Sequence, residues 1–199
     1  MVSNLTGTHW PRAIVLTWLK DHVPPPRLQH IVRVEVMAST LAQKHDLDPK
    51  KAAQAGLMHD LAKYFQPEQL LQWAKTHQLP LDPVDIANPH LLHAPVSALV
   101  AQAEFGICDP EILAAIRDHT LGQPQMSLLS CVVFLADSLE PGRGNRPELN
   151  EAREISQQDL YHGVAIACDL TLQHLLKTQQ LIHPRMVLTR NWAWLQIQS

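Results

Sequence analysis

Apolar side chains recur along this chain every three or four residues, which is the period of an amphipathic helix, over nearly its whole length. No segment shows the alternation of apolar and polar positions that predicts a strand. Prolines and glycines separate the periodic segments and mark where helices end or begin. The pattern predicts helices over residues 11–22, 27–45, 49–64, 67–78, 94–104, 110–119, 127–139, 158–178 and 184–195. We therefore expect an all-α fold.

The connections between these segments are too short to divide the chain. The clearest loop is PGRGNRP, residues 141–147, and a second, proline-rich connection contains Asn88 and Pro89. A length of 199 residues suits one domain of ordinary size. The sequence thus predicts a single helical-bundle domain over residues 1–199.

Charge and cysteine content narrow the class of protein. A net charge of −3 gives no basic surface for nucleic acid. The apolar run at residues 13–19 is too short for a membrane span or a signal peptide. Cys108, Cys131 and Cys168 form no CxxC pair and are expected to be buried, reduced thiols. We expect a cytoplasmic protein without nucleic-acid or membrane partners, whose oligomeric state, a homodimer included, stays open.

The segment GLMHDLAK, residues 56–63, places a histidine and an aspartate in an apolar helical stretch. Burying such groups without a partner costs several kcal/mol. Four other polar residues have a similar apolar setting, and the full set is His30, His59, Asp60, His93, His119 and Asp137. Imidazole and carboxylate together suit Fe, Mn, Co, Ni or Zn, and the helices of a bundle can direct them into one pocket. The sequence therefore predicts a metal site.

Asp60 lies between two groups of these candidates, so its carboxylate can bridge two ions. That leaves His30, His59 and Asp137 for one metal, and His93 and His119 for the other. Each residue also has a plainer explanation, because a lone histidine on an apolar face is more often a hydrogen-bonded core residue. Asp60 can pair with Lys63, and His90 is a rival ligand to His93. Six such positions in one ordered series favour the metal site.

The order of these residues resembles the HD-domain phosphohydrolase superfamily, and His93 and His119 resemble the additional ligands of its dinuclear members. The segments AGLMHDLAK, NPHLLHAPVSA, AAIRDHTLG, ADSLEPGR and IHPRMVLTRN are similar to the YqeK family of symmetrical bis(5′-nucleosyl)-tetraphosphatases. This resemblance extends from about Arg27 to Asn191. It implies an HD core over about residues 27–140, with C-terminal helices within residues 148–199 packed on it.

The resemblance also implies an activity. Two divalent or trivalent metal ions, iron first and manganese, cobalt, nickel or zinc as alternatives, polarise a phosphoryl oxygen. The substrate is diadenosine tetraphosphate, which is cut at its centre into two molecules of ADP. No Walker or GxGxxG loop is present to bind the phosphates, so cationic side chains are expected to do so.

Lys63, one turn beyond Asp60, and Arg143, in the loop after Asp137, are the predicted catalytic cations. The alternatives are a solvated charge for Lys63 and a salt bridge with Glu140 for Arg143. Thr120 is a hydroxyl donor or a cap. His183-Pro184 and Arg190-Asn191 either line the nucleoside pocket or form a plain helix start and a surface turn. The predicted substrate-binding set is Arg27, Asp60, Lys63, His93, His119, Thr120, Asp137, Arg143 and His183.

Other functions stay open at this point. HD folds also act on dNTPs, cyclic nucleotides or alarmones, and some di-iron members are oxygenases. A non-catalytic nucleotide- or metal-binding module belongs to a different class. The second pair of histidines, with Lys63 and Arg143, argues against such a module. An oxygenase would need reduced iron and O₂ and would release no phosphate product.

Overall fold

The computed structural model describes residues 12–197, and every regular element within them is a helix. The all-α prediction is confirmed. The α-helices are α1 (Arg12–His22), α2 (Pro25–Lys44), α3 (Pro49–Met58), α4 (Pro67–Thr76), α5 (Pro83–Ala87), α6 (His93–Phe105), α7 (Pro110–Asp118), α8 (Leu128–Leu139), α9 (Pro147–Ser156), α10 (Leu160–Lys177) and α11 (Pro184–Ile197). Two short 3₁₀ helices, η1 (Pro89–Leu92) and η2 (Pro141–Arg143), complete them.

The starts of the helices follow the sequence signals. Asp48 and Asp109 each cap a helix that begins with proline, and their Oδ1 atoms accept from Lys50 N at 2.8 Å and from Glu111 N at 2.9 Å. The helix predicted from residue 27 begins two residues earlier, because Pro25 takes the first helical position. The predicted start of the first helix at residue 11 lies outside the described residues.

Four short elements were missing from the sequence prediction. They are α5 and η1 in the proline-rich connection, η2 in the segment predicted as a loop, and α9. The pattern missed α9 because its buried face is small, consisting of Leu149, Ala152 and Ser156. Three such positions in ten residues give a weak periodic signal, although Pro147 marks the start.

The helix predicted to reach about Tyr64 ends at Met58 instead. The ring of His59 donates its Nδ1 hydrogen to the carbonyl of Gly56 at 2.7 Å, and this carbonyl is the one that the amide of Asp60 would use in a continued helix. The amide of Ala62 donates to Ser97 Oγ at 2.9 Å. Residues 59–65 therefore continue as turns, which include a bond from Lys63 N to Asp60 O of 3.1 Å.

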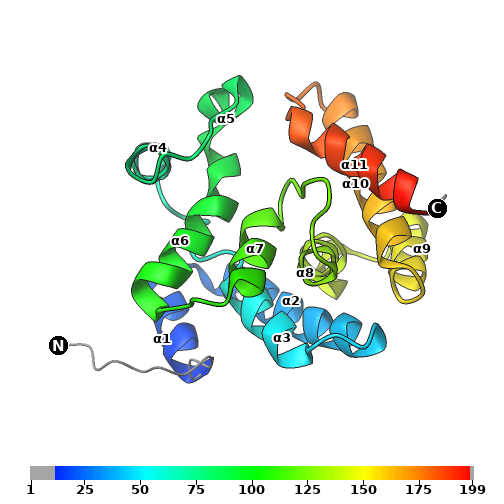
Figure 1. The fold of residues 1–199 in the computed structure, drawn as a ribbon, viewed down its shortest axis with the longest axis horizontal. Helices are drawn as coiled ribbons and strands as arrows, with labels where there is room; N and C mark the ends of the chain where they lie inside the picture. Colours follow the sequence, from blue (N-terminus) through cyan, green and yellow to red (C-terminus); the bar gives the residue numbers. More distant parts are fainter. Residues whose placement is uncertain (1–11, 198–199) are drawn as a thin grey trace.

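The helices form layers around α8, which packs against α2, α3 and α7 and also against α10 (Figure 1). Because neighbours cover it on several sides, nearly all of its sequence LLSCVVFLADSL is apolar and buried. On one side α3 packs closely along α2. A Cβ on Gly56 would lie 3.1 Å from Glu35 Cα and 3.2 Å from Val34 O, so this glycine permits the approach. The end of α3 is thereby held near α2 and α8, and α6 and α7 pack against α3.

The C-terminal helices pack on this group through α10, which contacts α8, α9 and α11. Within residues 12–197 no helix is both long and apolar enough to span a membrane. The three cysteines are unpaired. Cys131 and Cys168 are buried as predicted, but the prediction is wrong for Cys108, which is exposed in the connection before α7. The domain boundaries stay a prediction.

Candidate metal centre

The structure brings the six predicted ligands together from five parts of the fold. Their ligand atoms fall into overlapping groups of three within which all atoms lie within 4.8 Å of one another. All are buried except Asp137, which is half-buried. The set is His30 on α2, His59 and Asp60 just after α3, His93 at the start of α6, His119 just after α7, and Asp137 on α8.

Asp60 lies between two pairs of histidines. Its Oδ2 is 3.3 Å from His59 Nε2 and 3.9 Å from His30 Nε2. Its Oδ1 is 3.4 Å from His93 Nε2 and 3.8 Å from His119 Nε2. Ligand atoms that share one ion at about 2.0–2.2 Å stand roughly 3 Å apart, so each carboxylate oxygen is placed to join a different histidine pair.

Asp137 adds a second carboxylate beside the first pair. Its Oδ1 is 3.0 Å from His30 Nε2 and 3.7 Å from His59 Nε2. These distances fit the predicted division of the ligands, with His30, His59 and Asp137 on one side of Asp60. Which residues bind an ion stays a prediction.

The histidine rings are oriented by bonds on their far sides. His59, His93 and His119 each direct Nδ1 at the carbonyl three residues earlier. The acceptors are Gly56 O at 2.7 Å, His90 O at 2.6 Å and Ile116 O at 2.8 Å. A carbonyl only accepts, so each Nδ1 carries the hydrogen and each Nε2 offers a lone pair to the centre. His90, the rival ligand, thus contributes its backbone and has an exposed ring.

Two buried nitrogen atoms show that these residues fit a metal ion. His30 Nε2 and His59 Nε2 have no hydrogen-bond partner among the described residues. Buried polar atoms are rarely left unsatisfied, and an ion would satisfy both. Burial and nearby Lys63 lower the pKa of His93 to about 4, and burial with the neighbouring His59 lowers the pKa of His119 well below its ordinary value. Both rings are therefore neutral near pH 7, the form that binds metals.

Asp60 is ionised in this setting. Burial alone would raise the pKa of its carboxyl group, but the surrounding histidines, His59 foremost, outweigh burial and hold the pKa well below its ordinary value. Arg27 Nη1 also donates to Asp60 Oδ2 at 3.0 Å. Arg27 therefore lies where the sequence predicted it, beside the ligands and on the same side of α2 as His30.

Glu140 supports the centre from behind and was not among the predicted site residues. It is 1% exposed, and its Oε1 accepts from His30 Nδ1 at 3.0 Å. Its other oxygen accepts from Arg33 Nε and from Gly142 N. Together Arg33, His30 and the Gly142 amide offset burial and hold the pKa of Glu140 at about 2. The signal in the sequence was its place in the segment ADSLEPGR.

Arg143 does not pair with Glu140, which excludes that alternative for its role. Its Nη2 donates to Asp137 Oδ1 at 2.6 Å and its Nε donates to Asp137 O at 2.8 Å. Lys63 Nζ and Thr120 Oγ1 each lie 3.2 Å from His93 Nε2. Burial lowers the pKa of Lys63, against the opposing effect of Asp60 and Asp137. These side chains thus border the predicted ligands.

His183 lies apart from this cluster. Its Nε2 is 3.3 Å from Asp85 Oδ2, and its Nδ1 accepts from Arg185 N at 3.0 Å. It therefore fixes the first turn of α11 against α5. His183 is therefore not next to the predicted ligands. Its predicted contact with the substrate stays a prediction.

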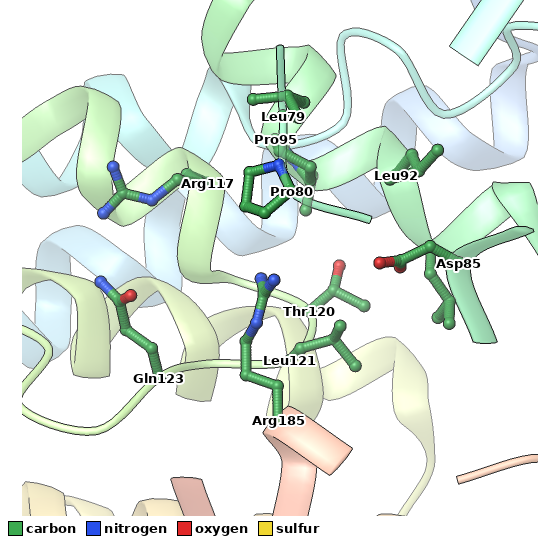
Figure 2. Close-up of a pocket in the computed structure, with 12 residues that line it drawn as sticks. Leu79, Pro80, Asp85, Leu92, Pro95, Arg117, Thr120, Leu121, Gln123 and Arg185 are labelled. Atoms are coloured by element: carbon green, nitrogen blue, oxygen red, sulfur yellow. The ribbon is translucent and has the colours of Figure 1, made fainter. Parts of the chain in front are cut away.

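One cavity has two of the predicted ligands in its wall, and a second cavity shares Thr120 with the first. The first, which we name the α10 cavity, has a volume of about 340 Å³ and is lined by His119, Asp137, Arg143 and residues of α10. The second, which we name the α11 cavity, has a volume of about 250 Å³ and includes Arg185 of α11 in its wall (Figure 2). Thr120 lines both cavities. Arg143 was predicted from the sequence, but Arg117, Arg146 and Arg185, which also line these walls, were not. Arg146 and Arg185 were missed because they lie further along the chain from the predicted ligands.

Comparison with known proteins agrees with this geometry. The HD domain family model matches residues 27–142. A Bacillus subtilis protein named "Bis(5′-nucleosyl)-tetraphosphatase, symmetrical" is 37% identical over 181 residues, covering 91% of this chain and 96% of the relative. A Halalkalibacterium halodurans protein of the same name is 35% identical over 185 residues, covering 93% and 98%. A Clostridium acetobutylicum crystal structure, described as a predicted HD superfamily hydrolase involved in NAD metabolism, superposes with a TM-score of 0.89 at 30% identity, covering 94% and 98%.

Proposed function

This chain belongs to the HD-domain family and, with its relatives, to the symmetrical bis(5′-nucleosyl)-tetraphosphatases, and we propose that it hydrolyses diadenosine tetraphosphate at the central anhydride to two ADP. The observation that carries the proposal is the position of Asp60. Its two oxygens face separate histidine pairs, and Arg27 lies against one of those oxygens. Such a centre suits a reaction in which phosphate charge must be balanced.

We propose two metal ions in this centre, with iron as their identity. His30, His59 and Asp137 would hold one, His93 and His119 the other, and Asp60 both. Bound ions supply Lewis acidity, which polarises a phosphoryl oxygen and makes water a nucleophile near neutral pH. The neutral Nε2 atoms and two carboxylates support this assignment, because imidazole with carboxylate is the donor set that such metals prefer.

The remaining side chains bind and orient the substrate. Water adds to one of the two central phosphorus atoms, the bond from that phosphorus to the bridging oxygen breaks, and the other half leaves as ADP. Lys63 and Arg143 are placed to neutralise the phosphate charge that builds up during this step. The Thr120 hydroxyl is placed to donate to a phosphate oxygen. Lys63 and Thr120 both lie 3.2 Å from His93 Nε2, so the attacked phosphate is expected beside His93.

The products of the reaction test this function. Pure metal-loaded protein is incubated with diadenosine tetraphosphate in ¹⁸O-labelled water, and early products are separated by chromatography. We expect ADP as the only nucleotide product, with one ¹⁸O atom in one ADP of each pair. ATP with AMP as the first products would overturn the proposal. So would rapid turnover of dNTPs or cyclic nucleotides with none of dinucleoside polyphosphates.

Glu140 is expected to control metal affinity through His30. Glu140→Ala leaves the His30 ring without its acceptor, and loss of such a supporting bond typically weakens metal binding by about 10–100-fold. Competition with a chelator measures the affinity. Glu140→Gln keeps an acceptor oxygen and should lose less. Glu111→Ala, at a glutamate that pairs with Lys51 away from the centre, is the control and should change nothing. Unchanged affinity in Glu140→Ala would contradict this role.

The remaining expectations concern location and partners. A small dinucleotide is the proposed substrate. The cytoplasmic location, the absence of nucleic-acid partners and a homodimer stay predictions. The three unpaired cysteines support a reducing compartment.

A further inference from the structure

We infer that the α10 and α11 cavities are two separate nucleotide sites, each of which holds one nucleoside diphosphate half of the substrate. This inference rests on the proposed function and adds to it where the two nucleosides bind. It assigns Arg146 to one half and Arg185 to the other. The central anhydride then lies between the cavities, beside the predicted metal ligands.

The arginines of the chain point to these two cavities. Nine arginines are present, all within the described residues. Seven of them donate to carboxylate or carbonyl oxygens, and those seven are Arg12, Arg27, Arg33, Arg117, Arg143, Arg153 and Arg190. Among residues 12–197, Arg146 and Arg185 have no such acceptor for their guanidinium groups. One lies in the wall of the α10 cavity and the other in that of the α11 cavity.

Each unpaired arginine lies in the same cavity as an arginine that already pairs with an aspartate. In the α10 cavity Arg143 pairs with Asp137 at 2.6 Å. In the α11 cavity Arg117 pairs with Asp118 at 3.0 Å. Planar guanidinium groups bind phosphate in bidentate fashion, so a free guanidinium beside a fixed one is suited to a diphosphate.

The α11 cavity also has surfaces for a nucleoside. Figure 2 shows Arg185 extending from α11 into the cavity toward Thr120, beneath Pro80. Leu79, Leu92 and Pro95 line it as well and offer apolar contact to a base. Asp85 is buried in this wall, and carboxylates accept hydrogen bonds from ribose hydroxyls. His183 holds Asp85 and the backbone of Arg185, which gives it a positioning role.

The α10 cavity has a comparable composition. Its apolar members include Leu149 and Leu170, and Thr171 and His174 are its polar ones along α10. His119 and Asp137 stand in the same wall, so the predicted ligands are reached directly from this side. A nucleotide half here would place its phosphates at the centre.

Size and position together explain a central cut. Sites for small molecules usually measure about 300–1,000 Å³, and cavities of about 250 Å³ and 340 Å³ lie just below and just above the lower end of that range, so neither is large enough for a whole dinucleotide. Thr120 is common to both and lies 3.2 Å from His93 Nε2. We place the tetraphosphate beside Thr120, the residue that the two cavities share. Its middle, two phosphates from each nucleoside, therefore lies at the predicted ligands.

The number of ADP molecules bound per chain tests this arrangement. ADP is a product and is not cut further, so isothermal titration of metal-loaded protein with ADP counts the sites. We expect two ADP per chain for the wild type. Arg185→Glu and Arg146→Glu should each weaken one of the two sites by about 10- to 100-fold, as expected for a lost charged hydrogen bond, and the double variant should weaken both. If a charge reversal disturbs folding, Arg185→Gln and Arg146→Gln replace these variants, and each should again weaken one of the two sites.

Lys177→Glu is the matched control, because this basic residue of α10 lines neither cavity, and it should keep two sites. One ADP per chain in a wild type that cuts diadenosine tetraphosphate into two ADP would overturn the inference and leave the function intact. Loss of the same site in both single variants would also overturn it. Failure to release ADP from diadenosine tetraphosphate would instead reject the function itself, whatever the stoichiometry.

Discussion

Asp60→Asn is expected to abolish hydrolysis and to strip metal from both halves of the centre. Asp60 faces both histidine pairs through separate oxygens, with Oδ2 3.3 Å from His59 Nε2 and Oδ1 3.4 Å from His93 Nε2. An amide keeps the shape of the side chain but removes the negative charge and one acceptor oxygen. Metal ions contribute several kcal/mol of charge stabilisation, so the loss in kcat should be at least about 10³. Elemental analysis and product assays measure the two effects.

Asp169→Asn is the matched control for this experiment. Asp169 pairs with Arg190 at 2.7 Å, as Asp60 pairs with Arg27 at 3.0 Å, but it lines neither cavity and is no predicted ligand. It should keep both metal content and kcat. An Asp60→Asn protein with two ions per chain and near wild-type kcat would refute the bridging role.

Lys63→Ala and Arg143→Ala are expected to keep the metals and lose turnover. Lys63 Nζ is 3.2 Å from His93 Nε2, and Arg143 pairs with Asp137, yet neither group can donate a lone pair to an ion as a cation. Removal of one group that stabilises charge in the transition state typically costs about 10²–10³ in kcat. Metal content and steady-state kinetics of each variant give the comparison, with the loss expected in kcat more than in KM.

Two cations outside the centre serve as controls. Lys51 pairs with Asp109 and Glu111, and Arg190 pairs with Asp169. Their alanine variants should stay within a few-fold of the wild type. Comparable activity in Lys63→Ala and Arg143→Ala would remove those two residues from the catalytic role.

Local sequence was sufficient for the helical fold and for finding the residues of the centre. Asp48 and Asp109 predict the starts of α3 and α7, because an aspartate before proline caps a helix through hydrogen bonds to amides within three residues. The six metal candidates could be selected for a similar reason. Each is a polar residue in a strongly apolar stretch, and such burial requires a partner whatever the fold.

Two features depended on competition between hydrogen-bond partners, which the pattern of apolar and polar residues does not show. The end of α3 at Met58 results from the His59 ring taking the Gly56 carbonyl and from Ser97, on another helix, taking the Ala62 amide. The partner of Glu140 is Arg33, which precedes it by 107 residues. Neither feature can be predicted from hydrophobic periodicity. Each depends on which polar groups the packing of the helices brings within hydrogen-bond distance.

The sequence by itself therefore determined the all-α class, the six metal candidates and the cations beside them. Only the tertiary structure decided that the two oxygens of Asp60 face different histidine pairs, and that Arg146 and Arg185 lie unpaired in two cavities that meet at Thr120. The physical reason is the separation along the chain of the residues that interact. Helix formation and burial cost follow from neighbours a few residues apart, whereas ligand geometry and cavity walls arise where distant helices pack against one another.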